Sequence, residues 1–299
     1  MNKGIWYGIG AYAMWGFFPI YWKLLHHVPA VELLGHRIAW SFIFLIVIIL
    51  ISKQWNEFRS LINKNTLRIY LIASLLIGVN WLLYVWAVNA GHIVETSLGY
   101  FINPLLSVFL GLIILREKLR TTQWIPIVIA FIGVIYLTFT YGRLPWIALG
   151  LAFSFGFYGL VKKLAPLSSV FGLTLETGIL FLPALVYLGV RQSDGSGAFL
   201  QTGLTADLLL IGAGIVTTIP LLMFASAAKQ IPLTMIGILQ YLAPTIQFLI
   251  GVFVYKESFD TPRLIGFSIV WLALIISWVE NFMSNRPQAP APLPEVGAD

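Results

Sequence analysis

The chain has 299 residues, of which 59% are hydrophobic and only 10% are charged. A soluble domain carries about 25% charged residues, so most of the outer surface of this chain must face something other than water. The formal net charge of +6 could indicate a nucleic-acid partner, but the basic residues are dispersed through short connections, as in the cytoplasmic loops of a membrane protein. The absence of cysteine excludes disulfide bonds, thiolate metal sites and cysteine nucleophiles.

Ten apolar stretches are long enough to cross a membrane as helices, because a bilayer core of about 30 Å needs about 20 residues. They lie at about 4–22, 31–51, 68–87, 93–115, 123–140, 144–161, 170–190, 207–227, 232–254 and 264–283. These runs lack the alternation typical of a membrane β-barrel. The sequence therefore predicts an all-α polytopic membrane protein with ten transmembrane helices. The first stretch has no cleavage site, so we expect it to remain in the mature protein.

The distribution of basic residues predicts the orientation of these helices. With the N-terminus inside, twelve Lys and Arg residues fall on the inner side and five on the outer side, and Arg37 lies within a helix. The positive-inside rule then places both termini in the cytoplasm. The proline-rich segment 284–299 cannot bury apolar surface, so we expect a disordered cytoplasmic tail.

The two halves of the chain resemble each other at a constant offset of 140 residues. This shift pairs Trp6 with Trp146 and Pro104 with Pro244, without a gap. The alternative explanation is chance overlap between helices rich in Leu and Gly. A repeat predicts two five-helix units, 4–143 and 144–283, and the odd number makes the second unit enter the membrane inverted. Inverted repeats let a carrier open alternately to either side around a site at the midplane.

Several blocks of the sequence resemble a known family. They include GxxAYxxWGFxPIYWK at 8–23, ExxxHRIxWS at 32–41, GVNWLLYVWAVN at 78–89 and ExSLGYFINPL at 95–105. They are similar to RarD-type proteins of the EamA branch of the drug/metabolite transporter superfamily, over essentially the whole chain apart from the tail. The resemblance implies a ten-helix permease of the bacterial plasma (inner) membrane that exports drugs or metabolites and is linked by name to chloramphenicol sensitivity.

Aromatic and polar residues near the predicted midplane are candidates for a substrate cavity, since a wall of rings with polar groups suits flat or amphipathic solutes. Pro104 and Pro244 should kink their helices and free the carbonyl groups four residues earlier, although both could be packing kinks alone. Interrupted helices commonly line cavities. The candidate cavity residues are Tyr12, Trp15, Arg37, Asn80, Trp81, Tyr84, Tyr100, Asn103, Gln240 and Tyr241.

Ionisable residues inside a membrane are costly, so each one is a candidate for function. Arg37 could pair with Glu95, contact an anionic substrate group, or extend outward to the interface. Glu32 and His36 share one helix face near the outer end of the same helix. Glu176 occupies the position equivalent to His36 in the second unit. Such groups would suit proton coupling, but a hydrogen-bonded carboxyl or an ion pair would look the same in sequence.

The pattern as a whole predicts a carrier that moves a small organic molecule across a lipid bilayer by alternating access. No GxxxxGK[ST] or HExxH motif is present, so we expect no P-loop nucleotide hydrolysis, no metal site, no cofactor and no catalytic residue. Two other classes remain open, namely a ligand-sensing receptor and a lipid flippase or intramembrane enzyme. The sequence leaves both a monomer and a homodimer open.

Overall fold

The computed structural model describes residues 2–90, 92–141, 144–255 and 261–284. Within these ranges the regular secondary structure is helical throughout, with no strand, which confirms the predicted all-helical class. Six helical segments are both long enough and apolar enough to cross a membrane, namely Ala30–Ile51, Lys64–Ala87, Thr121–Phe139, Trp146–Leu164, Ser169–Ser193 and Leu204–Gln230. The tail predicted to be disordered lies outside the described residues from position 285 onward.

Helices follow the predicted apolar stretches along the chain. The first half contains α1 (Lys3–Leu24), α2 (Ala30–Ile51), α3 (Trp55–Ser60), α4 (Lys64–Asn89), α5 (Ile93–Ile113), the short 3₁₀ helix η1 (Thr121–Gln123) and α6 (Trp124–Tyr141). The second half contains α7 (Trp146–Leu164), α8 (Ser169–Ser193), α9 (Leu204–Gln230), α10 (Leu233–Gln240), α11 (Leu242–Leu249), the π-helical turn η2 (Ile250–Val254) and α12 (Thr261–Ser284). The short helix α3 was not predicted; its Phe58 ring packs 5.4 Å from the ring of Phe171 on α8.

The predicted stretch 232–254 is interrupted at Tyr241, where α10 ends and α11 begins. Pro244 explains the interruption, because it has no N–H to donate to the carbonyl group of Gln240 and its ring crowds that carbonyl. Pro104 lies at the equivalent position of α5, yet α5 continues to Ile113 as one helix. Of the two equivalent prolines, only Pro244 therefore coincides with a boundary between two helices.

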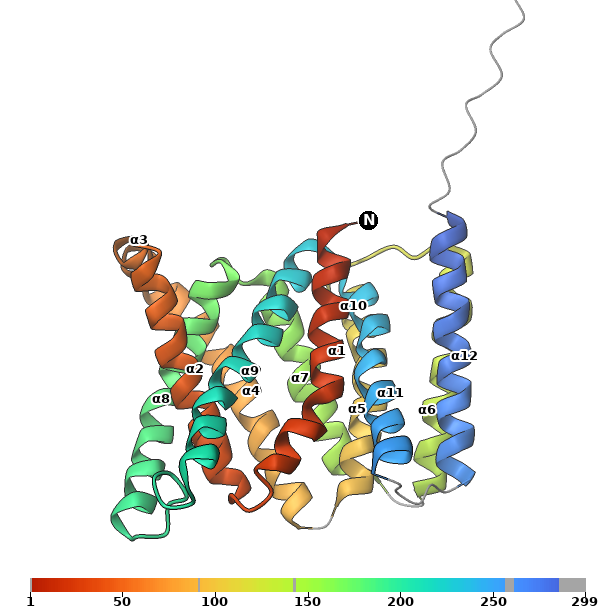
Figure 1. Ribbon diagram of the computed structural model, residues 1–299. Helices are drawn as coiled ribbons and strands as arrows, with labels where there is room; N and C mark the ends of the chain where they lie inside the picture. Colours follow the sequence, from red (N-terminus) through yellow and green to blue (C-terminus); the bar gives the residue numbers. More distant parts are fainter. Residues whose placement is uncertain (1, 91, 142–143, 256–260, 285–299) are drawn as a thin grey trace, which may run out of the picture.

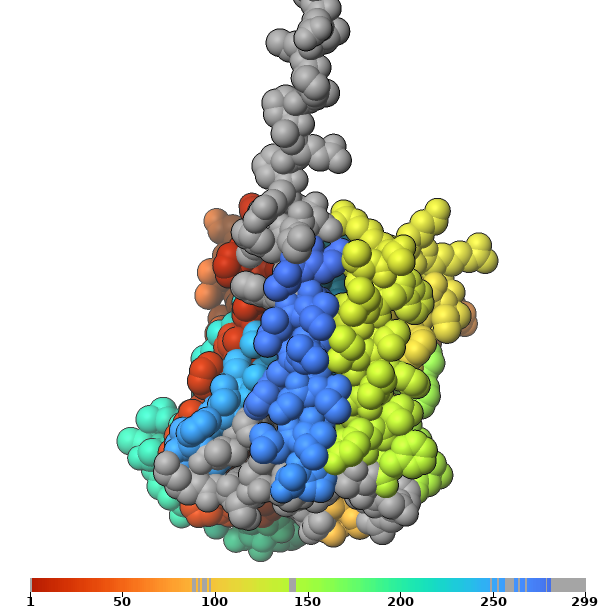
Figure 2. Space-filling view, turned by 90° about the vertical axis from the view of Figure 1, so that its right-hand side faces the viewer, coloured from red at the N-terminus to blue at the C-terminus, as the bar shows by residue number. Residues whose placement is uncertain are grey.

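The helices form a bundle in which the two halves interdigitate. Figure 1 shows α6 and α12 side by side at one edge and α2 and α8 toward the opposite edge, and both pairs are in contact. Figure 2 shows the outer face of the α6–α12 pair. Between these edges, α1 packs against α9 and α11, while α7 packs against α5 and α4. The N-terminal end of α1 and the C-terminal end of α12 lie on the same side of the bundle.

A close helix contact and a large apolar cluster fill the half of the bundle nearest the start of α1. The cluster includes the buried side chains of Leu45, Tyr158 and Leu233. A Cβ atom at Gly237 would lie 2.5 Å from the carbonyl oxygen of Pro104, so a glycine at this position lets α10 approach α5. Part of this cluster, including Tyr12, Leu221 and Ala243, also borders a cavity.

Candidate functional site

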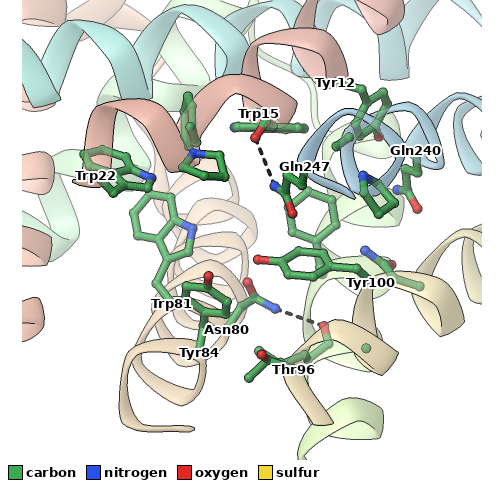
Figure 3. Close-up of a pocket in the computed structure, with 18 of the residues that line it drawn as sticks. Tyr12, Trp15, Trp22, Asn80, Trp81, Tyr84, Thr96, Tyr100, Gln240 and Gln247 are labelled. Atoms are coloured by element: carbon green, nitrogen blue, oxygen red, sulfur yellow. Dashed lines mark hydrogen bonds between the residues drawn. The ribbon is translucent and has the colours of Figure 1, made fainter. Parts of the chain in front are cut away.

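A cavity of about 310 Å³ lies inside the bundle, bordered by helices of both halves (Figure 3). This volume is at the lower end of the range of sites that bind small organic molecules. The lining residues lie near the middle of their helices or in the half of the bundle away from the N-terminus. They are Tyr12, Trp15, Phe18, Pro19, Trp22, Arg37, Asn80, Trp81, Tyr84, Thr96, Gly99, Tyr100, Asn103, Leu151, Phe155, Thr217, Leu221, Gln240, Ala243, Pro244 and Gln247.

Aromatic rings form much of the cavity wall. The rings of Tyr84 on α4 and Tyr100 on α5 meet edge to face, with their centroids 6.0 Å apart. On the other side, the indole of Trp15 on α1 meets the ring of Phe155 on α7 in the same way, at 5.9 Å. Edge-to-face packing favours these ring orientations by about 0.5–1.5 kcal/mol for each pair. The cavity therefore offers a partly preorganised aromatic surface to a solute.

Arg37 places a positive charge in the wall of the cavity. Its Nε atom donates a hydrogen bond to the hydroxyl of Thr217 on α9 at 3.0 Å. The guanidinium group lies 4.8 Å from the ring of Trp22 and 5.1 Å from a ring of Trp81, which are cation–π distances. No carboxylate among the described residues forms an ion pair with Arg37. The side chain of Glu95, the predicted alternative partner, lies outside the described part of the chain.

Two amides that border the cavity also join helices. Asn80 on α4 donates hydrogen bonds to the carbonyl of Leu151 and the hydroxyl of Ser154 on α7, both at 2.9 Å. Gln247 on α11 donates to the carbonyl of Trp15 on α1 at 3.0 Å. All three bonds connect the first half of the chain to the second, so these amides also help to fix the width of the cavity.

The structure brings together every predicted cavity residue except Tyr241. Tyr241 lies at the break between α10 and α11 and is 4% exposed. Its side chain joins the cluster between α5, α6 and α12, where the hydroxyl donates to the carbonyl of Phe101 at 3.3 Å. The neighbouring Gln240 lines the cavity, and consecutive helical residues point about 100° apart. The expectation that both face one space is therefore corrected.

Sequence reasoning missed several lining residues. Thr217 and Gln247 are the most informative, because each makes a hydrogen bond across the bundle. Gln247 follows Pro244 by nearly one helical turn, so the position of the kink could have indicated it. Thr217 carried no comparable signal, since a lone threonine in an apolar helix commonly bonds to its own backbone.

Glu32 and His36 lie near the N-terminal end of α2 but do not line the cavity. One oxygen of Glu32 accepts a 2.5 Å hydrogen bond from the backbone N–H of Ala198, and the other lies 3.7 Å from Arg191. The ring of His36 packs 5.2 Å from the ring of Phe199. Both side chains thus hold the segment between α8 and α9 against α2.

Glu176 also lies apart from the cavity lining, in a buried pair. Its Oε1 atom is 2.6 Å from the ammonium group of Lys162, and its Oε2 atom accepts a hydrogen bond from Tyr158 at 2.9 Å. The ion-pair interpretation left open by the sequence describes this geometry. The predicted site residues thus fall into three groups: those that line the cavity, Glu32 and His36 against the segment between α8 and α9, and Glu176 in a buried ion pair.

Comparison with known proteins identifies the family of the chain. The EamA-like transporter family matches the chain twice, at residues 2–139 and 144–279. An "Uncharacterized transporter YojE" from Bacillus subtilis strain 168 is 48% identical over 92% of this chain and 93% of its own length. A "Protein RarD" from Streptomyces exfoliatus is 45% identical over 96% of this chain and 92% of its own length.

A solved structure supports the fold independently of sequence. The crystal structure of a protein that is only 16% identical superposes with a TM-score of 0.69, covering 93% of this chain and 98% of that one. At this identity the likeness shows the fold alone. The assignment therefore depends on the sequence matches. They show that the chain belongs to the EamA-like transporter family as a RarD-type permease, and this membership indicates a membrane transporter rather than an enzyme.

Proposed function

We propose that the chain is an alternating-access carrier made of two inverted units of five membrane-spanning helices, 4–143 and 144–283. The family match to each half separately supports a repeat. The contacts between helices support it as well, because each contact between halves has a counterpart. The contact of α1 with α9 corresponds to that of α7 with α4, and the contact of α5 with α7 corresponds to those of α10 and α11 with α1.

The single observation that carries the proposal is the cavity shared by both halves, closed toward one side of the bundle by the apolar cluster. With both termini in the cytoplasm, as the basic residues predict, the closed side faces the cytoplasm and the cavity belongs to the outer half. The described conformation would then be the outward-facing one. Rocking of the two halves would expose the same residues to the cytoplasm.

The lining favours a small organic solute over an inorganic ion. Aromatic rings dominate the walls, and Arg37 is the only lining residue with a permanent charge among the described residues. In the bacterial inner membrane, the expected role is export of drugs or metabolites. Proton coupling would supply the driving force if export runs against a gradient.

Counterflow in sealed vesicles tests this function. Purified protein is reconstituted with an unlabelled aromatic solute inside, and entry of the same labelled solute is followed across a panel of aromatic carboxylates and amides. We expect labelled solute to accumulate transiently without chemical change. Ala243→Phe, which places a ring in the cavity, should abolish counterflow, whereas Ile275→Phe on the exposed face of α12 should not. Conversion of the solute to a new compound would indicate an enzyme instead.

A further inference from the structure

The inner end of the cavity is polar and differs from the outer end. Tyr12 on α1, Asn103 on α5 and Gln240 on α10 line it, and all three side chains are more than nine-tenths buried. Figure 3 shows Tyr12 and Gln240 at one end of the cavity and Trp22 and Trp81 at the other. Tyr12 and Trp22 are ten residues apart on α1, which corresponds to about 15 Å along the helix axis. The two ends can therefore contact different groups of one elongated solute.

Hydrogen-bonding groups at this inner end are left unsatisfied. The Tyr12 hydroxyl lies near the Gln240 side chain but makes no well-formed hydrogen bond to a described residue, and neither does the carbonyl oxygen of Asn103. The Gln240 amide has only long contacts of 3.3 and 3.4 Å with the hydroxyl of Ser107. Buried polar groups nearly always have a partner, so each exception needs an explanation. A bound solute would supply one.

The chemistry of these groups selects the kind of solute group. A phenolic hydroxyl can donate to a carbonyl oxygen, and the Asn103 carbonyl oxygen can accept from an N–H. An amide group carries both a carbonyl oxygen and an N–H, and the two lie in one plane. Among the described residues at this end of the cavity none carries a formal charge, whereas Arg37 faces the same cavity beside Trp22 and Trp81. The inner end therefore suits a neutral group and the Arg37 end an anionic one.

We infer that Tyr12, Asn103 and Gln240 form a hydrogen-bonding subsite for a neutral amide of the transported solute. The solute class that follows is an elongated aromatic molecule with a carboxylate at the Arg37 end and an amide at the opposite end. This inference rests on the proposed carrier function and deepens it. In this binding mode, the aromatic rings that line the cavity between its two ends would contact the middle of the solute.

Two probes with the same number of heavy atoms and the same branching test the subsite. 4-Acetamidobenzoate carries the amide, and 4-isobutylbenzoate replaces its N–H by a methylene and its carbonyl oxygen by a methyl group. Their dissociation constants are measured by isothermal titration calorimetry on the purified full-length protein. We expect the native protein to bind the amide probe about tenfold more tightly. Tyr12→Phe and Asn103→Leu should lower this ratio toward one, mainly by weakening binding of the amide probe.

The controls separate the subsite from general effects on folding. Tyr187→Phe removes a phenolic hydroxyl outside the cavity and should keep the native ratio. Unchanged affinity for 4-isobutylbenzoate in Asn103→Leu shows that the variant is folded. Equal binding of the two probes by the native protein, binding of neither, or the native ratio in both cavity variants would overturn the subsite. Absence of counterflow with every solute would instead refute the carrier function, whatever the ratio of the two affinities.

Discussion

Lys162 on α7 and Glu176 on α8 form an ion pair that is almost completely removed from solvent. The ammonium nitrogen lies 2.6 Å from the carboxylate, and the side chains are 2% and 1% exposed. Tyr158 donates to the second carboxylate oxygen, and its ring stacks on Phe224 with centroids 6.0 Å apart. Phe224 in turn packs against Trp15 of the cavity wall. The pair is thus connected to the cavity wall through the rings of Tyr158 and Phe224.

Removal of one member of this pair should strongly destabilise the protein. Glu176→Gln leaves the charge of Lys162 buried without a counter-ion, and breaking a buried pair in this way costs about 3–5 kcal/mol. We expect a lower folded yield and a lower thermal unfolding temperature for the purified protein. Lys118→Met, which removes an exposed charge on the same predicted side, should change neither.

Replacement of both members should restore stability. Lys162→Met combined with Glu176→Leu leaves no charge to be buried, and such exchanges are often neutral or stabilising. If the double variant is stable and carries out counterflow at the native rate, the pair is structural only. If it is stable but inactive, the charges take part in transport. A native unfolding temperature for Glu176→Gln alone would show that Lys162 finds water or another partner.

Glu117 joins the two halves of the chain on the closed side. It follows α5, and its carboxylate accepts hydrogen bonds from the backbone N–H groups of Leu233 at 2.7 Å and Thr234 at 3.0 Å, at the start of α10. A cap of this kind contributes about 1 kcal/mol. Its loss should favour opening of this side by about fivefold.

Thiol labelling measures that opening, since the native chain has no cysteine. Ala73 is fully buried in the apolar cluster on α4, so an Ala73→Cys thiol should react slowly with a water-soluble reagent. Glu117→Ala should accelerate labelling about fivefold. Glu57→Ala, which removes a surface carboxylate on α3, serves as the control. Equal labelling rates in the two backgrounds would contradict a latching role for Glu117.

Thiol labelling should distinguish Tyr241 from Tyr84 and Tyr100, although the sequence assigned all three tyrosines to one cavity. Tyr84 and Tyr100 line the cavity and keep 37% and 39% of their surface exposed, whereas Tyr241 is buried against α5 and α12. Cysteines at positions 84 and 100 should react with a small charged thiol reagent, and a cysteine at 241 should not. Rapid labelling at 241 would place this residue back in the cavity.

Much of the fold could be predicted because a membrane imposes length and hydropathy on each spanning helix. The apolar stretches accordingly coincide with helices, and their ends differ by a few residues. The short helix α3 could not be found in this way, because six residues are far too few to span a membrane. The break at Tyr241 could be anticipated from Pro244, but the continuity of α5 through Pro104 could not, because the two equivalent prolines behave differently in different packing environments.

The composition of the cavity was easier to predict than its contacts. Ionisable and amide side chains are costly among lipid tails, so those near the predicted midplane were expected to point into the bundle. The partner of a charged group depends on helix packing that the sequence does not contain, so Glu176 could not be assigned to Lys162 from spacing. Tyr241 was misplaced because consecutive helical residues point about 100° apart, so it faces the cluster with α5 and α12 while Gln240 lines the cavity.

Orientation of the helices in the membrane can be tested with reporter fusions. The positive-inside rule predicts a cytoplasmic signal for fusions after Lys64, Lys118 and Lys163, and an outer signal after His27, Arg143 and Ser196. Two reporters are fused in turn at each position. One is active only in the periplasm, and the other is active only in the cytoplasm. An outer signal at Lys118 would contradict the ten-span arrangement, because every later span depends on it.

Arg37 provides the sharpest test of how the cavity recognises a solute. Under the substrate interpretation, Arg37→Gln inserts and folds normally but binds 4-acetamidobenzoate about tenfold to a hundredfold more weakly, since a hydrogen bond to a charged group contributes about 1.5–3 kcal/mol. Binding of 4-methylacetanilide, which lacks the carboxylate, should be unchanged. Arg37→Lys should restore binding only in part, because lysine keeps the charge but loses the planar group that lies against Trp22 and Trp81.

The competing interpretation, an internal pair with Glu95, predicts the opposite pattern. Arg37→Gln would then leave a carboxylate in the membrane without a counter-ion and lower the folded yield, and the additional change Glu95→Gln would restore it. We favour the substrate role, because Arg37 lines the cavity and its Nε is already held by Thr217. Rescue of folded yield by Glu95→Gln would establish the pair instead. Counterflow at the native rate in Arg37→Gln would contradict both roles and leave the residue a structural link between α2 and α9.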